Sequence, residues 1–390
     1  MNFVEFYLME RKLPPGFSIE DIETVGEFIK DELGKSASEE EVTDADVQKV
    51  DIDALKALRL DPKKQVELQK TQKLGLADRP QKMLHTSNIV DENGNLIDND
   101  ALRKKISQRP ANLIGQNEKL SKSGIDATFF DFTIPAYQGL YVDESTGEFK
   151  VVRTCPAAGI CKKFCYASKG GYIQFPPSSL SSTRMINYIM NDYEGFKSQM
   201  IRELEKAVKY RARVGKKVIL RWHDAGDFLS EKYFDMVMDI AKATPNVLHY
   251  TYTKQIPLLK QKQVSMPPNF KITMSMGGIY DDLIDKEKDT FADVVPPELF
   301  KDLKFKKKGE ANNKFGNGTG KLFADEDIKV LKKRIAEHFK INNEENIITY
   351  DEMQKIKDEG TKKYYVLVWS GHGDDAGARS DVKGIFLFFH

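Results

Sequence analysis

The chain has 390 residues, of which 40% are hydrophobic, and its 60 Lys and Arg nearly balance its 59 Asp and Glu. Such a balance gives no overall field that would attract nucleic acid or an anionic membrane surface. No apolar stretch is long enough to span a membrane, and the N-terminal residues do not have the pattern of a signal peptide. We therefore expect a soluble, cytoplasmic protein with one large domain or two.

The first part of the chain, residues 1–108, is charged, poor in aromatic residues and helical in pattern. Thr43 with Asp46 resembles a capping box, which marks the start of a helix. These features predict an N-terminal helical extension that is packed on the core or tethered to it.

The pattern over residues 109–300 alternates between short apolar runs and amphipathic stretches. Phe196, Met200 and Leu204 recur every four positions and predict a helix, and Ser230 is placed to cap another. We expect strands at 127–137, 139–154, 216–222, 246–253 and 270–276, and helices at 193–214, 231–244 and 257–264. This α/β alternation predicts parallel strands in βα units, which either close into a partial or complete (βα) barrel or stay open as a doubly wound sheet.

Residues 301–361 break this pattern. The basic stretch 304–321 is rich in Gly and Asn and predicts a loop, and helices are expected at 325–340 and 350–359. Phe305 and Phe315 among the lysines could contact a nucleic acid, although a solvated loop is the simpler interpretation.

The last segment, residues 362–390, gives two apolar strands that we expect to complete the core. A polar loop joins them and carries four residues with functional side chains, which are His372, Asp374, Asp375 and Arg379. These residues belong to a site only if the loop folds back over the ends of the core strands.

The three cysteines, Cys155, Cys161 and Cys165, all lie within eleven positions, just after the strand expected to open the parallel series. An odd, clustered set of thiols argues against disulfides and for binding of a metal. Zinc would need a fourth ligand, for which His223 or Asp227 is available, but the paired knuckles of structural zinc sites are missing. Three thiolates suffice for a [4Fe–4S] cluster whose fourth iron is open to a ligand.

Polar residues follow the other predicted strands, at the edge where parallel sheets carry their sites. His223 is a candidate general base or ligand, Asp224 and Asp227 could bind a metal or an amino group, and Lys254 could bind a carboxylate or phosphate. A core histidine and turn or capping carboxylates are the structural alternatives. We expect His223 and Asp227 to be partly solvated, so that their loss affects function more than stability.

A second set of residues is expected to contact a cofactor. Phe164 would shield a cluster with an apolar ring, and Gly226 would let a ligand approach the backbone closely. The full set is Phe164, Tyr166, Gly226, Gly277 and Gly278.

Several stretches together resemble the gene product 88 family of tailed-phage proteins. They include "TCPAAGICKKFCYASKGGY", "LRWHDAGDF" and the closing "VKGIFLFFH". The resemblance covers residues 112–295 and the C-terminal thirty, and it implies a phage protein in the host cytoplasm. It implies no activity, because none is established for the family.

The layout of these stretches is similar to the radical S-adenosylmethionine barrel. A cysteine triplet follows the first strand, an aromatic residue adjoins the last cysteine, and a small polar motif follows the second strand. The cysteine spacing differs from that of the radical enzymes, and "HDAGD" stands in place of their Gly-Gly-Glu.

These observations support three hypotheses. The first is a [4Fe–4S] protein which, if it is an enzyme, performs radical S-adenosylmethionine-like chemistry on a small-molecule or nucleotide-related substrate. The second is a zinc or two-metal hydrolase built from His223, Asp224, Asp227 and the 372–375 loop. The third is a metal-stapled module that binds nucleic acid or protein through 304–321.

Overall fold

The computed structural model describes a defined part of the chain, to which all structural statements below refer. The described residues are 97–116, 127–163, 176–262, 266–300, 323–356, 360–369 and 373–388, the short pieces 47–49 and 302–303, and positions 88, 91, 93, 95, 120, 165 and 167. Most of the predicted N-terminal extension and the whole 304–321 loop lie outside them. Within them, no helix combines the length and the apolar composition that crossing a membrane requires.

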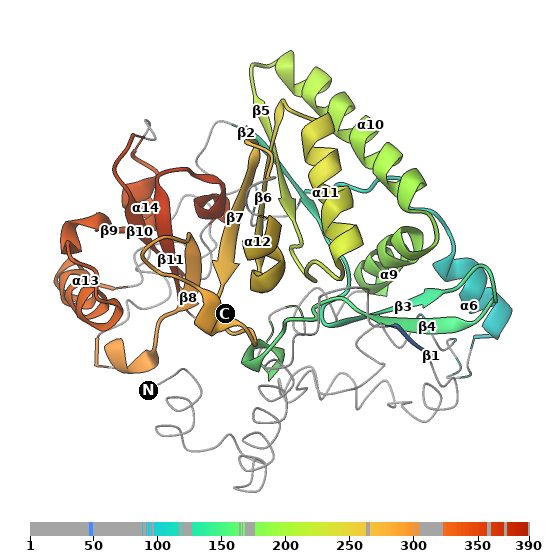
Figure 1. Cartoon of the computed structure of the whole chain (residues 1–390), viewed down its shortest axis with the longest axis horizontal. Helices are drawn as coiled ribbons and strands as arrows, with labels where there is room; N and C mark the ends of the chain where they lie inside the picture. Colours follow the sequence, from blue (N-terminus) through green and yellow to red (C-terminus); the bar gives the residue numbers. More distant parts are fainter. Residues whose placement is uncertain are drawn as a thin grey trace, which may run out of the picture.

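An eight-stranded sheet forms the centre of the molecule (Figure 1). Its strand order is β2-β5-β6-β7-β8-β11-β10-β9, and every neighbouring pair is parallel. The strands are β2 (Ala127–Phe132), β5 (Lys217–Trp222), β6 (Val247–Thr253), β7 (Phe270–Ser275), β8 (Phe291–Val294), β9 (Ile347–Thr349), β10 (Tyr364–Trp369) and β11 (Val382–Phe388). The predicted α/β class with parallel strands is thus confirmed.

A closed barrel is not observed, since β2 and β9 stand at the two ends of the hydrogen-bonded strand order. No pairing joins these two strands within the described residues. The sheet is therefore open.

Helices connect the first strands of the sheet, as the alternation predicts. Their bounds are α9 (Pro176–Asn191), α10 (Tyr193–Ala212), α11 (Glu231–Ala243) and α12 (Ile256–Lys262). The side chain of Ser230 caps α11 by accepting a hydrogen bond from the backbone N–H of Tyr233 at 3.2 Å. Phe196, Met200 and Leu204 on α10 are fully buried against the sheet, which explains their spacing of four residues.

A second, three-stranded antiparallel sheet corrects one prediction. It has the order β1-β4-β3 and is built from β1 (Val47–Lys49), β3 (Gln138–Val142) and β4 (Phe149–Arg153). The strand before Cys155 therefore belongs to a hairpin and does not open the parallel series, which begins with β2. The link between β3 and β4 is a tight turn in which Gly147 N–H donates to Asp143 O at 2.7 Å, and so short a link allows only antiparallel pairing.

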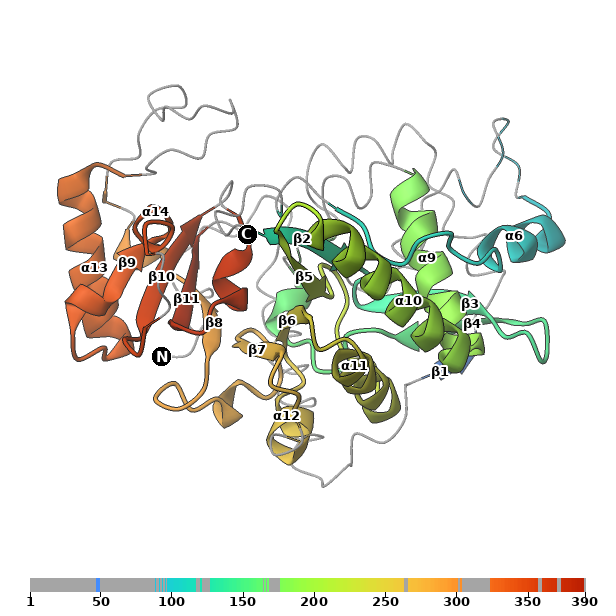
Figure 2. The same cartoon turned by 90° about the horizontal axis from the view of Figure 1, so that it is seen from above.

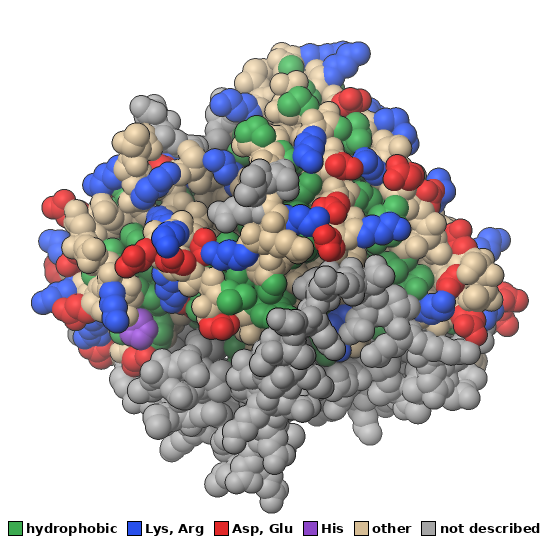
Figure 3. Space-filling model, viewed as in Figure 1, with side chains coloured by type: hydrophobic (Ala, Val, Ile, Leu, Met, Phe, Trp, Pro, Cys, Tyr) green, Lys and Arg blue, Asp and Glu red, His purple; other side chains and the backbone are tan. Residues whose placement is uncertain are grey.

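The C-terminal strands join the main sheet, as expected for residues 362–390. β11 inserts between β8 and β10, while α13 (Asp325–Phe339) and α14 (Tyr350–Met353) flank the same end of the sheet. Figure 2 shows these C-terminal elements at one end of the molecule and the β3–β4 hairpin with α6 (Asn99–Ile106) at the other. Positive and negative side chains are intermixed on the described part of the face shown in Figure 3, in keeping with the balanced charge of the chain.

Candidate metal and ligand site

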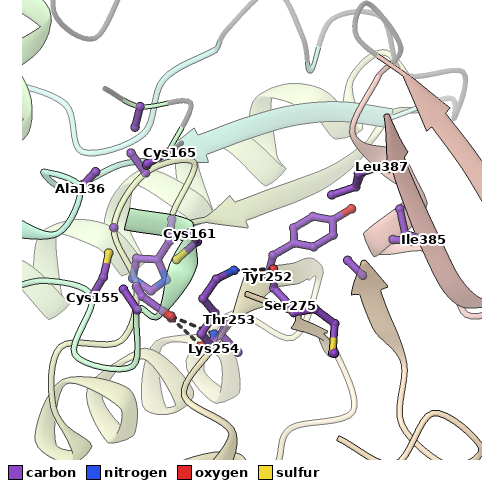
Figure 4. Close-up of a pocket in the computed structure, with 18 of the residues that line it drawn as sticks. Ala136, Cys155, Cys161, Cys165, Tyr252, Thr253, Lys254, Ser275, Ile385 and Leu387 are labelled. Atoms are coloured by element: carbon purple, nitrogen blue, oxygen red, sulfur yellow. Dashed lines mark hydrogen bonds between the residues drawn. The ribbon is translucent and has the colours of Figure 1, made fainter. Parts of the chain in front are cut away.

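A pocket of about 210 Å³ lies at the carboxyl ends of the parallel strands (Figure 4). Residues from the ends of β5, β6, β7, β8, β10 and β11 line it, together with the loop that follows β4. This is the edge at which parallel α/β sheets place their ligands. The candidate residues of the sequence analysis were expected at this same edge.

All three cysteines line this pocket. The cysteine loop is fastened to the end of β7, where Ala158 forms an antiparallel bridge with Gly278 and Cys161 N–H donates to Gly277 O at 3.2 Å. A second link joins the same loop to β5, because Asp227 N–H donates to Thr154 O at 2.9 Å. The loop therefore reaches the sheet edge although its own strand belongs to the small sheet.

The thiols are set in surroundings that disfavour their charged form. Burial raises the pKa of Cys155 and of Cys161, and the Lys254 ammonium partly offsets this effect at Cys161. The backbone N–H of Tyr137 donates to Cys155 Sγ at 3.3 Å. Among the described Cys, His, Asp and Glu side chains, no three converge closely enough to hold a single metal ion.

His223 lines the pocket but is only 3% exposed. Its Nε2 lies 2.9 Å from the hydroxyl oxygen of Tyr233, while its Nδ1 has no hydrogen-bond partner in the described part of the chain. Burial, together with the nearby Arg221 cation, lowers the pKa of His223 to about 3. The imidazole is therefore neutral at physiological pH.

Asp227 is 4% exposed and is held by three donors. Its Oδ1 accepts hydrogen bonds from Phe228 N–H at 2.8 Å and from the Thr253 hydroxyl at 2.5 Å, and its Oδ2 accepts one from Lys254 N–H at 2.9 Å. Burial raises the pKa of this carboxyl group despite these bonds. The expectation that His223 and Asp227 are partly solvated is wrong. The His223 ring packs against Phe132, Phe228 and Tyr233, and the Asp227 carboxylate is enclosed by the end of β6.

Asp224 is paired with Arg221, and the same guanidinium group pairs with Asp374 at 2.5 Å. This ion-pair triad joins the end of β5 to the loop between β10 and β11. That loop thus folds back over the strand ends, which is the condition under which it contributes to the site. Of its polar residues Asp374 lines the pocket, whereas Asp375 binds Tyr350 and Gln354.

The remaining loop residues have other positions. Arg379 pairs with Asp381 at 2.6 Å and supports the loop from within. His372 lies outside the described residues, as do the predicted cofactor contacts Phe164 and Tyr166.

Lys254 lines the pocket, and its Nζ donates to Ser275 Oγ at 2.7 Å. Gly226 also lines it, with a φ of 84° that favours glycine. Gly277 and Gly278 are not among the lining residues; their backbones hold the cysteine loop instead, and a Cβ on Gly278 would lie 2.9 Å from Ala157 O.

Sequence reasoning missed Arg221, Ser275 and the apolar residues at the far end of the pocket. Arg221 did carry a signal, because a cation enclosed by the apolar residues of "VILRW" must find an anionic partner when both faces of its strand are covered. Ser275 and the apolar residues carried none, because only the strand order brings them to the same place.

Comparison with known proteins gives one match. No curated protein and no solved structure matches the chain. The family model for gene product 88 matches residues 105–337, which is more than half of the chain. The chain therefore belongs to the gene product 88 family.

Proposed function

We propose that the protein binds a [4Fe–4S] cluster through Cys155, Cys161 and Cys165 and uses the adjoining pocket to bind a small molecule. One observation carries the proposal. All three cysteines of the chain line a single pocket, together with polar residues that follow β5 and β6. A purely structural role for the cysteines does not require all three thiols to line a cavity, so their position supports ligand binding.

The donor set suits a cluster better than a single ion. A single metal ion needs its ligands to converge on one point, and the described side chains do not. In a cluster each thiolate binds its own iron, so the sulfur atoms stand around a larger object. The Tyr137 N–H bond to Cys155 Sγ and the apolar side chains of Ala136 and Ala158 are the kinds of surroundings that tune such clusters.

A bound cluster with an open iron would supply an electron and a coordination site. The residues of the chain would then position the ligand. His223 offers a neutral nitrogen, Lys254 offers a cation, and Asp227 holds the loop after β5 against β6.

S-adenosylmethionine as a co-substrate is supported by the parallel strands and by the place of the pocket at their carboxyl edge. One feature argues against it, because the cysteine loop follows an antiparallel hairpin and not a strand of the parallel sheet.

The hydrolase alternative has less support from the geometry. Both oxygens of Asp227 accept hydrogen bonds from the protein, Asp224 is paired with Arg221, and His223 Nε2 is bonded to Tyr233. A catalytic metal would have to displace the partners of Asp227 and Asp224, whereas His223 Nδ1 has no hydrogen-bond partner among the described residues. The nucleic-acid alternative depends on residues 304–321, which lie outside the described part of the chain.

The test is anaerobic purification followed by measurement of iron, labile sulfide and zinc. We expect a brown protein with equal amounts of iron and sulfide, and we expect Cys155→Ser, Cys161→Ser and Cys165→Ser each to lose most of both. Ala167→Ser is the matched control, because it adds a hydroxyl group to the same wall without removing a thiol. Stoichiometric zinc without sulfide would overturn the proposal.

A further inference from the structure

The pocket has a second end that differs in chemistry from the cysteine end. Tyr252 from β6, Val294 from β8, Val368 from β10, and Ile385 and Leu387 from β11 line it. The strand register pairs Val294 with Leu387 and Leu387 with Val368, so these side chains share one face of the sheet. In Figure 4 Tyr252, Ile385 and Leu387 lie together, across the pocket from the cysteines. We call this end the apolar chamber; the Arg221–Asp374 ion pair borders it, and the guanidinium group lies over the Tyr252 ring.

Lys254 and Ser275 stand between the chamber and the cysteines. Side chains alternate along a strand, so Lys254, just beyond the end of β6, projects on the same side as Tyr252. The ammonium group of Lys254 donates to Ser275 Oγ at 2.7 Å, which leaves the serine hydroxyl hydrogen to be donated elsewhere. Both side chains line the pocket, so the pair presents N–H and O–H donors to it.

The other charged groups of the pocket already have partners. Arg221 is paired with Asp374, and Asp293 is paired with Lys286 at 3.0 Å. In the described part of the chain, no carboxylate lies within ion-pair distance of the Lys254 ammonium group, and the nearby carboxylates of Asp227 and Asp281, which interact with its charge, already accept hydrogen bonds from backbone N–H groups. A cation that borders an apolar chamber without a paired carboxylate is suited to an anionic ligand.

We propose that the pocket binds a small organic anion with an apolar body. The carboxylate, phosphate or sulfonate group accepts hydrogen bonds from Lys254 and Ser275, and the apolar body packs against Tyr252, Ile385 and Leu387. This inference deepens the proposed function and rests on it for the choice of pocket. A polyhydroxylated ligand is disfavoured, because its hydroxyl groups would lose water against these walls without gaining hydrogen bonds.

Two fluorescent probes test both halves of the inference with the anaerobically purified full chain. Anilinonaphthalene sulfonate carries an anionic group on an apolar body, and phenylnaphthylamine is the same body without the sulfonate. We expect Lys254→Met to weaken binding of the sulfonate probe by about tenfold or more, the size of one charge-assisted hydrogen bond. Binding of phenylnaphthylamine should be unchanged in this variant.

Two further variants complete the design. Lys217→Met is the matched control, because Lys217 is exposed at the opposite end of β5. Leu387→Gln should weaken both probes, since it makes the chamber wall polar. If Lys254→Met leaves the affinity for the sulfonate probe unchanged, or Leu387→Gln leaves both affinities unchanged, the inference is wrong.

Iron and sulfide are measured in the same samples, so the two proposals can fail separately. If the purified protein contains no iron and Lys254→Met still weakens binding of the sulfonate probe, the anion-binding proposal is supported and the cluster proposal is rejected. If the protein contains a full complement of iron and sulfide but Lys254→Met does not change binding of the sulfonate probe, the cluster proposal stands and the anion-binding proposal is rejected.

Discussion

Asp227 accepts a hydrogen bond from the hydroxyl group of Thr253 at 2.5 Å and a second from the backbone N–H of Lys254 at 2.9 Å. One buried carboxylate thus ties the loop after β5 to the end of β6. Lys254, whose side chain reaches into the pocket, is fixed at its backbone by the same group. Asp227 is therefore a positioning residue for the pocket as well as part of its wall.

We predict that Asp227→Ala lowers the free energy of unfolding by about 2–3 kcal/mol, because it leaves three donors without an acceptor in a buried place. Urea denaturation followed by circular dichroism measures this change. Asp282→Ala, at an exposed position, should leave stability unchanged. Wild-type stability in Asp227→Ala would show that the carboxylate serves a ligand and not the fold.

The ion-pair triad around Arg221 gives a second prediction. Arg221→Met should cost about 3–5 kcal/mol of stability, because it leaves two carboxylates buried without their cation. Arg334 is the matched control, since it forms a comparable ion pair with Asp302 on the surface. Solvent screens that pair, so Arg334→Met should change stability little. Equal effects in denaturant titrations would contradict the role assigned to the triad.

The parallel core could be predicted from the sequence because its signal is local. Apolar runs, helical spacing and the cap at Ser230 are properties of neighbouring residues, and the βα alternation follows from them. β8 and β9 were missed because strands of 4 and 3 residues are too short for a periodic signal. The strand before Cys155 has the local pattern of any strand, and only the short link between β3 and β4 gives it an antiparallel partner outside the main sheet.

The site was predictable to the extent that strand ends meet at one edge. That rule accounts for the place of "HDAGD" at the pocket, whereas the cysteine loop reaches the same pocket from the antiparallel sheet and lies outside the rule. The rule does not indicate which side chains form hydrogen bonds with one another. The burial of His223 and Asp227 among their partners is therefore not visible in the sequence. Most of the apolar chamber comes from β10 and β11, which lie more than a hundred residues beyond β5, and only the insertion of β11 between β8 and β10 brings their side chains to those of β8.

His249 makes the third prediction, on the pH dependence of stability. Its Nδ1 accepts a hydrogen bond from Trp222 Nε1 at 3.0 Å, and its Nε2 lies 2.9 Å from Thr244 Oγ1. The Thr244 hydroxyl already donates to Ile240 O at 2.7 Å, so Nε2 carries the proton and Nδ1 must stay bare. Burial accordingly lowers the pKa of His249 to about 3, from 6.5.

A folded pKa below the unfolded one means that the unfolded chain takes up the proton first. The contribution of His249 to the free energy of unfolding is therefore fully present above pH 6.5. It falls by about 1.4 kcal/mol for each pH unit as the pH decreases from 6.5 toward about 3. Denaturant titrations at several pH values in this range give the slope of the free energy of unfolding against pH. We expect this slope in His249→Gln to be smaller than in the wild type by the equivalent of one proton. Identical slopes would contradict the buried neutral imidazole.

Gly226 gives the last prediction, in comparison with Gly215. Both have positive φ, at 84° and 67°, so an alanine at either position suffers backbone strain of about 1–2 kcal/mol. Their surroundings differ. A Cβ on Gly226 would lie 2.3 Å from Ile134 Cγ1, whereas a Cβ on Gly215 would meet nothing within 4 Å.

The difference between the two alanine variants therefore isolates the contact between the "HDAGD" turn and the segment after β2. We expect Gly226→Ala to be less stable than Gly215→Ala by about 1–3 kcal/mol, the usual cost of overpacking. Ile134 is fully buried and cannot move aside without disturbing the core, so the turn itself must shift. Because Gly226 lines the pocket, that shift should also weaken binding of the sulfonate probe in Gly226→Ala and leave it intact in Gly215→Ala. Thermal melts and probe titrations of the two variants measure both effects, and equal results for both would show that the turn is not held by this contact.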